Sequence, residues 1–142
     1  MKLFLPDLLV GRRFQLPTFF GSSILSLEGG ARCILIGMIC LSVLYTNAAG
    51  KRFDYDYYAQ KHLPLALERL KDLGMTRYEI DRGVSGPAPG SPPAFLCIGR
   101  LYFDTLEGFQ QGLAEHGPEL LADVPNYTDA ELVLQVSETS TG

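Results

Sequence analysis

The stretch MICLSVLYTNAAGKRFDYDYYAQKHLPLALERLKDLG, residues 38–74, places a strand directly before a helix and thereby sets the fold. Its first nine residues alternate, so that every second residue from Ile39 to Tyr45 is apolar and points the same way. This period of two predicts a β-strand over 38–46 with one fully apolar face. The NAAGK that follows predicts a turn, because Asn and Gly favour tight chain reversals.

Residues 54–73 have the spacing of a helix. Asp54 is a suitable N-cap, and an apolar stripe at i, i+4 and i+7 begins at Leu63. Pro64 lies inside this pattern, so we expect a kink or a restart of the helix there. Gly74 closes the helix at its C-terminal end.

The rest of the chain adds two strands, a second helix and a last strand. Asp104-Thr-Leu-Glu107 has the pattern of a capping box, which predicts that the second helix opens at Asp104. Gly117-Pro118 is expected to interrupt this helix. The strands are expected at 75–84, 94–103 and 130–138, with a rigid Gly- and Pro-rich loop at 85–93 and a turn-rich loop at 123–129.

The resulting order, β-α-β-β-α-β, predicts an α+β fold of the ferredoxin-like type. It has a four-stranded antiparallel sheet with two helices on one face. The strands also carry apolar residues on the opposite face, such as Cys40, Leu44 and Ile98. We therefore expect a homodimer in which the uncovered faces of two sheets pack together.

Composition sets limits on function. The chain has 142 residues, 46% hydrophobic and 20% charged, which is typical of one globular domain. A net charge of −4 without a basic stripe argues against broad nucleic-acid binding. Three cysteines, Cys33, Cys40 and Cys97, have neither disulfide-framework nor zinc spacing, and buried thiols in a reducing compartment are expected.

The first 37 residues differ from the remainder, with four basic and two acidic residues among short apolar patches. No patch approaches the roughly 18–20 apolar residues of a membrane helix. Three interpretations stay open: an extension upstream of a start at Met38, without a fold of its own; a targeting or membrane-contact segment; and a structural arm. The domain is expected over 38–138, with a short tail at 139–142.

Residues 38–138 resemble the EthD family, whose members belong to the dimeric α+β barrel superfamily. The resemblance covers the whole core in order and leaves out residues 1–37. It implies the two-helix, four-stranded protomer and the sheet-to-sheet homodimer. The matching segments are SVLYTN at 42–47, RFDYDYYAQKHLPL at 52–65, VSGPAPGSPPAF at 84–95 and DVPNYTD at 123–129.

For function, the resemblance implies a small cytoplasmic enzyme of catabolism. The family is named after ethyl tert-butyl ether degradation, and many members are labelled reductases, so proton transfer or oxidoreduction on a small apolar or aromatic oxygenated compound is expected. The sequence has no dinucleotide-binding fingerprint, which weakens a literal reductase reading, and no cofactor is expected. The alternative is a non-catalytic accessory protein that holds a hydrophobic ligand for another enzyme.

His62 is the main candidate for catalysis. It stands where the family pattern YYxxxHxPL has its histidine, and imidazole gives and takes protons near neutral pH. Tyr58, one helical turn before His62 on the same face of the helix, is expected to donate a hydrogen bond to a substrate oxygen. The other interpretation is that His62 only braces the kink at Pro64 through the backbone.

Four further residues are expected to contact the substrate, and a metal site is not expected. A loop role is expected for Asn126 and Tyr127, although an Asx-turn also explains Asn126. His116 is expected to be structural, because it lies near a helix end, where the helix dipole favours a cation. A metal site is not expected, because the chain has neither HxxxH nor HxH spacing. The expected substrate contacts are Tyr45, Leu65, Asn126 and Tyr127.

Overall fold

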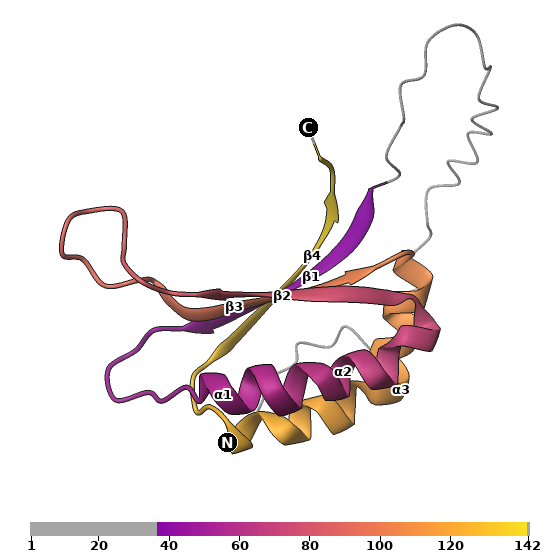
Figure 1. Ribbon diagram of the computed structural model, residues 1–142, viewed down its shortest axis with the longest axis horizontal. Coiled ribbons are helices and arrows are strands. Elements are labelled where there is room, and N and C mark those ends of the chain that lie inside the picture. Colours follow the sequence, from indigo (N-terminus) through magenta and orange to yellow (C-terminus); the bar gives the residue numbers. More distant parts are fainter. Residues whose placement is uncertain (1–36, 142) are drawn as a thin grey trace, which may run out of the picture. The chain divides into compact units, whose positions relative to one another are not determined.

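The computed structural model describes residues 37–141, which form one antiparallel sheet with helices on one face (Figure 1). The strand order is β2-β3-β1-β4, so the first strand of the chain lies inside the sheet between the third and the fourth. The expected α+β fold, with a four-stranded antiparallel sheet, and the expected order of elements along the chain are confirmed. The strands are β1 (Met38–Thr46), β2 (Met75–Arg82), β3 (Phe95–Phe103) and β4 (Leu132–Thr139).

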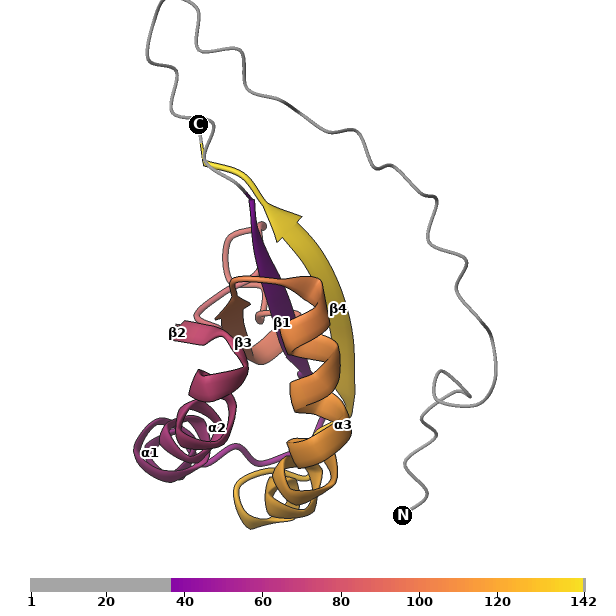
Figure 2. The same cartoon turned by 90° about the vertical axis from the view of Figure 1, so that its right-hand side faces the viewer.

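Two helical segments cover the same side of this sheet, as both views of the ribbon show (Figures 1 and 2). The first is continuous but not uniform, and the second ends in a short 3₁₀ turn. The first comprises α1 (Tyr55–Tyr57), the π-helical turn η1 (Tyr58–His62), α2 (Leu63–Leu70) and the 3₁₀ turn η2 (Lys71–Leu73). The second comprises α3 (Leu106–Asp123) and η3 (Val124–Asn126).

The expected ends and the expected irregularity of the first helical segment are confirmed. The Asp54 side chain accepts a hydrogen bond from the backbone N–H of Tyr57, and Gly74 closes the segment with a left-handed φ of 97°. Ahead of Pro64 the helix widens, and the Leu63 N–H bonds the Tyr58 carbonyl five residues back. A proline removes a backbone donor from a helix, and this π-turn absorbs the disturbance and sets the direction of His62.

Two expectations for the second helix were wrong. Its N-cap is Thr105, which accepts from the Gly108 N–H at 3.1 Å, and not Asp104. The Asp104 N–H is bonded to the Gly74 carbonyl at 3.0 Å, which holds this residue outside the helix. Pro118 does not interrupt α3. Proline has no backbone N–H, so the carbonyl of Ala114, four residues earlier, lacks its helical hydrogen bond. Pro118 and Ala114 are both exposed, so water can bond this carbonyl instead.

The core lies between the helices and the covered face of the sheet. Leu41, Tyr45 and Phe103 from the strands are each at most 8% exposed and meet buried residues of the helices such as Leu63. Aromatic rings gather at one end of this layer, where Tyr45 packs edge-on against Tyr58 with ring centroids 5.4 Å apart. The aromatic end therefore adjoins the π-turn that carries His62.

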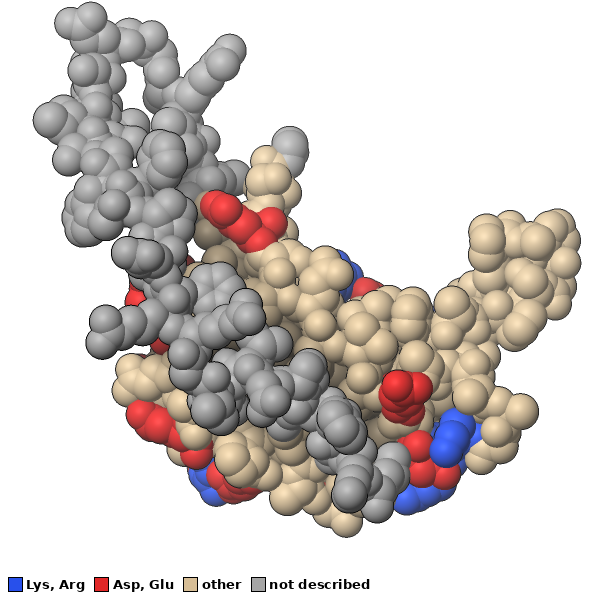
Figure 3. Space-filling model, turned by 180° about the vertical axis from the view of Figure 1, so that it is seen from behind, with Lys and Arg blue, Asp and Glu red and all other residues tan. Residues whose placement is uncertain are grey.

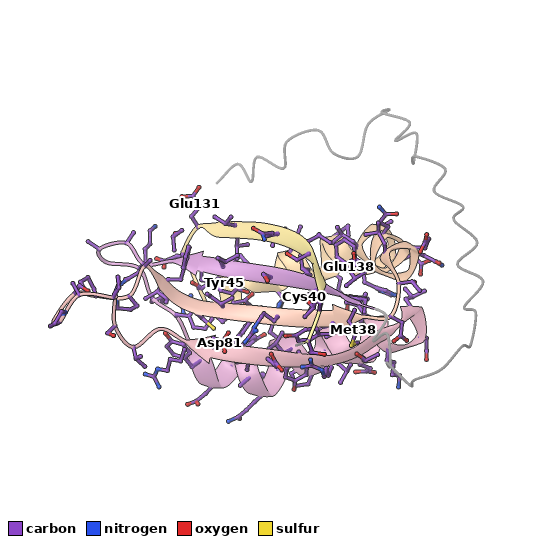
Figure 4. All side chains as sticks on the ribbon, turned by 90° about the horizontal axis from the view of Figure 1, so that it is seen from above. Met38, Cys40, Tyr45, Asp81, Glu131 and Glu138 are labelled. Atoms are coloured by element: carbon purple, nitrogen blue, oxygen red, sulfur yellow. The ribbon has the colours of Figure 1, made fainter. Side chains whose placement is uncertain are left out.

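The opposite face of the sheet is uncovered within residues 37–141 and is seen from above in Figure 4. One row across it is apolar, because the strand registers align Val133, Leu44 and Ile98. Towards the β2 edge the face is charged, but its charges are paired. Arg100 bonds Asp81 at 2.7 Å and Glu79 at 3.3 Å.

Among the residues that the structure describes, no helix combines the length and the apolar character needed to cross a membrane. The β2–β3 loop projects from the sheet and contains no charged side chain between Val84 and Ala94 (Figure 3). Val84 at its base is 85% exposed.

Gly99 on β3 provides the space for the Tyr58 hydroxyl. A β-carbon at this position would lie 1.9 Å from the Tyr58 hydroxyl oxygen and 3.1 Å from the ring carbon that bears it. We therefore expect Gly99→Ala to lower the free energy of unfolding by about 1–3 kcal/mol, as for other overpacked cores. Urea denaturation measures this change.

The control is a double-mutant cycle with Tyr58→Phe, which removes the closer of the two clashing atoms. Part of the stability lost in Gly99→Ala should return when Tyr58→Phe is added. Strictly additive effects would show that the two residues are not in contact.

Candidate functional site

A cavity of about 70 Å³ lies between α3, the π-turn and the covered face of the sheet. Most of its wall is aliphatic, including Leu63 and Leu120. Leu113 and Leu134, which are 37% and 41% exposed, also line it, so the cavity reaches the surface between α3 and β4. Its polar lining comes from four aromatic side chains: Tyr45, Tyr58, His62 and Tyr127.

His62 is held from one side by a carboxylate. Its Nδ1 lies 2.8 Å from Oδ2 of Asp123, the last residue of α3, 61 residues further along the chain. His62 is 8% exposed as a residue, and the Asp123 side chain is 16% exposed. Because an ionised carboxylate only accepts hydrogen bonds, this contact places a proton on Nδ1.

The other ring nitrogen of His62 begins a chain of hydroxyl groups. The Tyr127 hydroxyl lies 3.3 Å from His62 Nε2, and the Tyr45 hydroxyl lies 2.8 Å from the Tyr127 hydroxyl. Tyr127 follows η3, and Tyr45 is on the covered face of β1, so the chain joins three separate parts of the fold. It runs from Asp123 through His62 and Tyr127 to Tyr45.

The second oxygen of Asp123 has its own partners. The Tyr57 hydroxyl donates to Oδ1 at 2.8 Å, and the Asn126 side-chain amide donates to the same atom at 2.9 Å. Both oxygens of the carboxylate are therefore occupied, and the side chain has one orientation. Such outer partners fix the direction in which a histidine presents its free nitrogen.

Burial and hydrogen bonding set the protonation states of these groups. Burial lowers the pKa of His62, and this effect exceeds the opposite effect of the Asp123 carboxylate. Burial raises the pKa of Asp123, but hydrogen bonds from His62, Asn126 and Tyr57 outweigh it and hold the pKa below its ordinary value. Burial also raises the pKa of Tyr127, so the hydroxyl keeps its proton. At neutral pH the site contains a neutral imidazole beside a carboxylate.

His62 is the most accessible of the polar groups at the cavity. It keeps 8% of its surface exposed, against 1% for Tyr45 and Tyr58 and 0% for Tyr127. Tyr58 stacks on the imidazole, with the two ring planes 17° apart and the centroids separated by 5.5 Å. Tyr58 therefore also supports the face of the imidazole.

The structure brings four of the six expected site residues together. His62, Tyr58, Tyr45 and Tyr127 all line the cavity. Leu65 is half-buried on α2 and is not among the lining residues. Asn126 is exposed and does not line the cavity. Its side-chain amide donates to Asp123.

Asp123 is the functional candidate that sequence reasoning missed. Its pairing with His62 joins residues of two separate helical segments, 61 residues apart in the sequence. The available signal was an acidic residue two positions ahead of the PNY segment, in a loop for which a role was expected. Within residues 37–141, no three or more His, Cys, Asp or Glu side chains lie close enough together to bind a metal ion. His116 lies elsewhere on α3, beside Glu115 and Glu119.

Comparison with known proteins gives a consistent result. A family model of the EthD domain matches residues 49–131, more than half of the chain. No curated protein matches. Among solved structures, an EthD-like protein from Ralstonia eutropha JMP134 is 40% identical, with a TM-score of 0.68 over 72% of this chain and 91% of its own. An EthD (ethyl tert-butyl ether d) family protein from Bacillus halodurans C-125 is 20% identical over 72% and 99%, with a TM-score of 0.50, and so supports the fold alone.

The lowered pKa of His62 predicts how stability depends on pH. The unfolded chain binds the histidine proton near pH 6.5, whereas the folded protein binds it only at lower pH. The contribution of His62 to stability is thus complete above this value and is lost progressively as the pH falls below it. We expect the NMR titration midpoint of His62 to lie below 6.5.

Melting temperatures across the same pH range give the matching control. His62→Gln should flatten the decrease that the parent shows below pH 6.5. A midpoint at or above 6.5 would show that the Asp123 carboxylate dominates over burial.

Proposed function

Because this chain belongs to the EthD family, we propose that it is a small enzyme that transfers a proton to or from a compound bound in the cavity beside His62. The compound would be small, neutral, apolar or aromatic, and would carry one oxygen. One observation carries the proposal: a neutral imidazole, oriented by a carboxylate, stands at a largely apolar cavity that opens to the surface.

The cavity lining supports a neutral, largely apolar substrate. Among the described residues that line it there is no lysine or arginine, so within residues 37–141 the lining offers no cation to pair with a charged ligand. A pocket of this kind obtains affinity from apolar contact and orientation from a few polar groups. The hydroxyls of Tyr58 and Tyr127 are the groups available to orient a substrate oxygen, together with Tyr45 behind Tyr127.

The cavity volume supports a small substrate. At about 70 Å³ it is roughly half of an apolar cavity of about 150 Å³ that is known to admit benzene. A single ring therefore requires some displacement of the wall. Leu113 and Leu134 are suited to this, because both are partly exposed at the mouth.

Proton transfer is the chemistry that these side chains supply. A histidine near its neutral form can act as general base or general acid, and general acid–base catalysis typically contributes about 10²–10⁴-fold to the rate. Oxidoreduction and a role in ether degradation rest on the family alone. An oxidation or reduction would also require an electron donor or acceptor, and the residues that line the cavity do not indicate which one.

The second candidate function is that of an accessory protein, which holds an apolar ligand for an oxidative enzyme. The observation in its favour is that the tyrosine hydroxyls near His62 are nearly inaccessible and are already bonded to one another. A binding protein needs only the apolar wall, whereas an enzyme needs one of these bonds to open.

We also propose that two copies pair through the uncovered faces of their sheets. The apolar row of Val133, Leu44 and Ile98 would then be buried, which stabilises association. Like-charge repulsion would be small, since Arg77 and Arg100 balance Glu79 and Asp81 on the same face. The free thiols of Cys40 and Cys97 agree with the cytoplasmic location that we expect.

Replacing His62 tests the catalytic role. His62→Ala should lower turnover of the identified substrate by roughly 10²–10⁴-fold, because the proton acceptor is lost. The substrate is to be found first, by screening small aromatic compounds and ethers for thermal stabilisation of the parent. His116→Ala, which removes the other histidine and changes no residue of the cavity lining, should leave turnover unchanged.

If His62→Ala turns over substrate at the parent rate, His62 is not the proton carrier. If no compound is turned over by the parent while apolar compounds still stabilise it, the accessory function replaces the enzymatic one.

Two valines on β4 test the dimer. Val133 on the uncovered face and Val136 on the helix-covered face are 46% and 44% exposed. Val133→Asp should shift the mass in light scattering from dimer to monomer, because it places carboxylates in the proposed interface. Val136→Asp should leave the mass unchanged, and a parent that is monomeric at high concentration would contradict the proposal.

A further inference from the structure

We propose that Asp123 is a positioning residue that makes His62 Nε2 the proton acceptor, so that the reaction begins with removal of a proton from the substrate. This inference rests on the proposed function and deepens it. It gives the first proton transfer a direction and adds a residue that acts through His62 without touching the substrate. It also narrows the substrate class to compounds with a removable proton, such as a phenolic hydroxyl or an enolisable carbonyl.

The first step is the contact between the carboxylate and the imidazole. Asp123 Oδ2 is 2.8 Å from His62 Nδ1, and an ionised carboxylate can only accept. The proton of the neutral imidazole therefore lies on Nδ1, and Nε2 carries the free electron pair.

The second step is the anchoring of the carboxylate itself. Tyr57 and Asn126 both donate to Oδ1, at 2.8 and 2.9 Å. Tyr57 precedes Asp123 by 66 residues, and Asn126 follows it by three. Within the described part of the chain, His62 is then the one partner of Oδ2. These two donors need an acceptor at the Oδ1 position. In an asparagine variant, they would therefore hold the amide oxygen at this position.

The third step concerns the electron pair on Nε2. Its partner in the structure is the Tyr127 hydroxyl at 3.3 Å, which lies beyond the roughly 2.7–3.2 Å usual for hydrogen bonds between nitrogen and oxygen. The next bond, from Tyr45 to Tyr127, is shorter at 2.8 Å. The weakest point in the chain is therefore at Nε2, where a substrate group can displace Tyr127.

The proton transfer then balances as follows. The substrate O–H or C–H bond breaks, its electron pair stays on the substrate, and a new N–H bond forms at Nε2. The imidazolium is stabilised by Asp123, as an adjacent carboxylate stabilises a positive ring. The displaced Tyr127 hydroxyl is free to donate to the oxygen that has become negative.

The titratable groups that face this histidine come from every element around it. They are Asp123 from α3, Tyr127 after η3 and Tyr58 from η1 in direct contact, with Tyr57 and Tyr45 one bond further. Tyr58, Tyr127 and Tyr45 are buried phenols, so among residues 37–141 the carboxylate is the one negative charge in contact with the ring.

The experiment is ¹⁵N NMR of the imidazoles in the full chain, which reports the tautomer of His62 without any substrate. In the parent, Nε2 should give the signal of an unprotonated ring nitrogen and Nδ1 that of a protonated one. In Asp123→Asn, the two donors hold the amide oxygen at the Oδ1 position, so the amide NH₂ faces Nδ1. The tautomer should then reverse, as in catalytic triads with the same replacement.

Asp129→Asn is the matched control. Asp129 lies six residues further along the chain, after η3. It accepts from the Arg52 backbone N–H and does not contact His62, so the tautomer should stay as in the parent. A parent with the proton on Nε2 would overturn the inference, even if no variant folds. An Asp123→Asn variant that keeps the parental tautomer would overturn it too.

Turnover separates this inference from the proposed function. With a substrate in hand, Asp123→Asn should lower kcat by roughly 10²–10⁴-fold with little change in KM, because the base presents the wrong nitrogen. If the tautomers behave as expected but the parent turns over nothing, the enzymatic function fails while the positioning by Asp123 stands. If turnover survives the reversal of the tautomer, the assigned direction of proton transfer is wrong.

Discussion

The hydrogen bond between Asp123 and His62 is the constraint on which the rest of the site depends. It joins the π-turn of the first helical segment to the end of α3, across 61 residues of chain. Both groups are largely withdrawn from water, so the partnership matters more than it would at the surface. A lone buried carboxylate or a wrongly directed imidazole would be costly. The same contact therefore fastens the two helices together and orients the imidazole at the cavity.

The π-turn and the covered face of the sheet hold His62 in position for this contact. The π-turn that precedes Pro64 brings both Tyr58 and His62 onto the buried side of the segment. Tyr58 can lie flat against the imidazole because Gly99 leaves room for its hydroxyl on the sheet. Tyr45, on the covered face of β1, is the last group in the chain of hydroxyls. Packing of the sheet is thus coupled directly to the position of the reactive nitrogen.

Local signals made much of the fold predictable from the sequence. The alternation in β1, the cap at Asp54 and the left-handed Gly74 each depend on a few neighbouring residues, and each is confirmed. The start of α3 was misplaced by one residue, because a long-range bond from Asp104 to the end of the first helical segment decides it. The pairing of Asp123 with His62 could not be predicted for the same reason. Spacing along one helix identifies residues that share a face, but it says nothing about which residue of another helix meets them.

The most direct test of the account is a titration of the parent with phenol and with methoxybenzene, followed through the imidazole ¹⁵N signals. The two probes share a ring, but only phenol can give a hydroxyl proton to Nε2. The account predicts a saturable shift of the His62 Nε2 signal with phenol, a much smaller one with methoxybenzene, and none at His116. Equal shifts with both probes, or phenol binding that leaves Nε2 unchanged, would contradict the claim that this nitrogen receives the substrate proton.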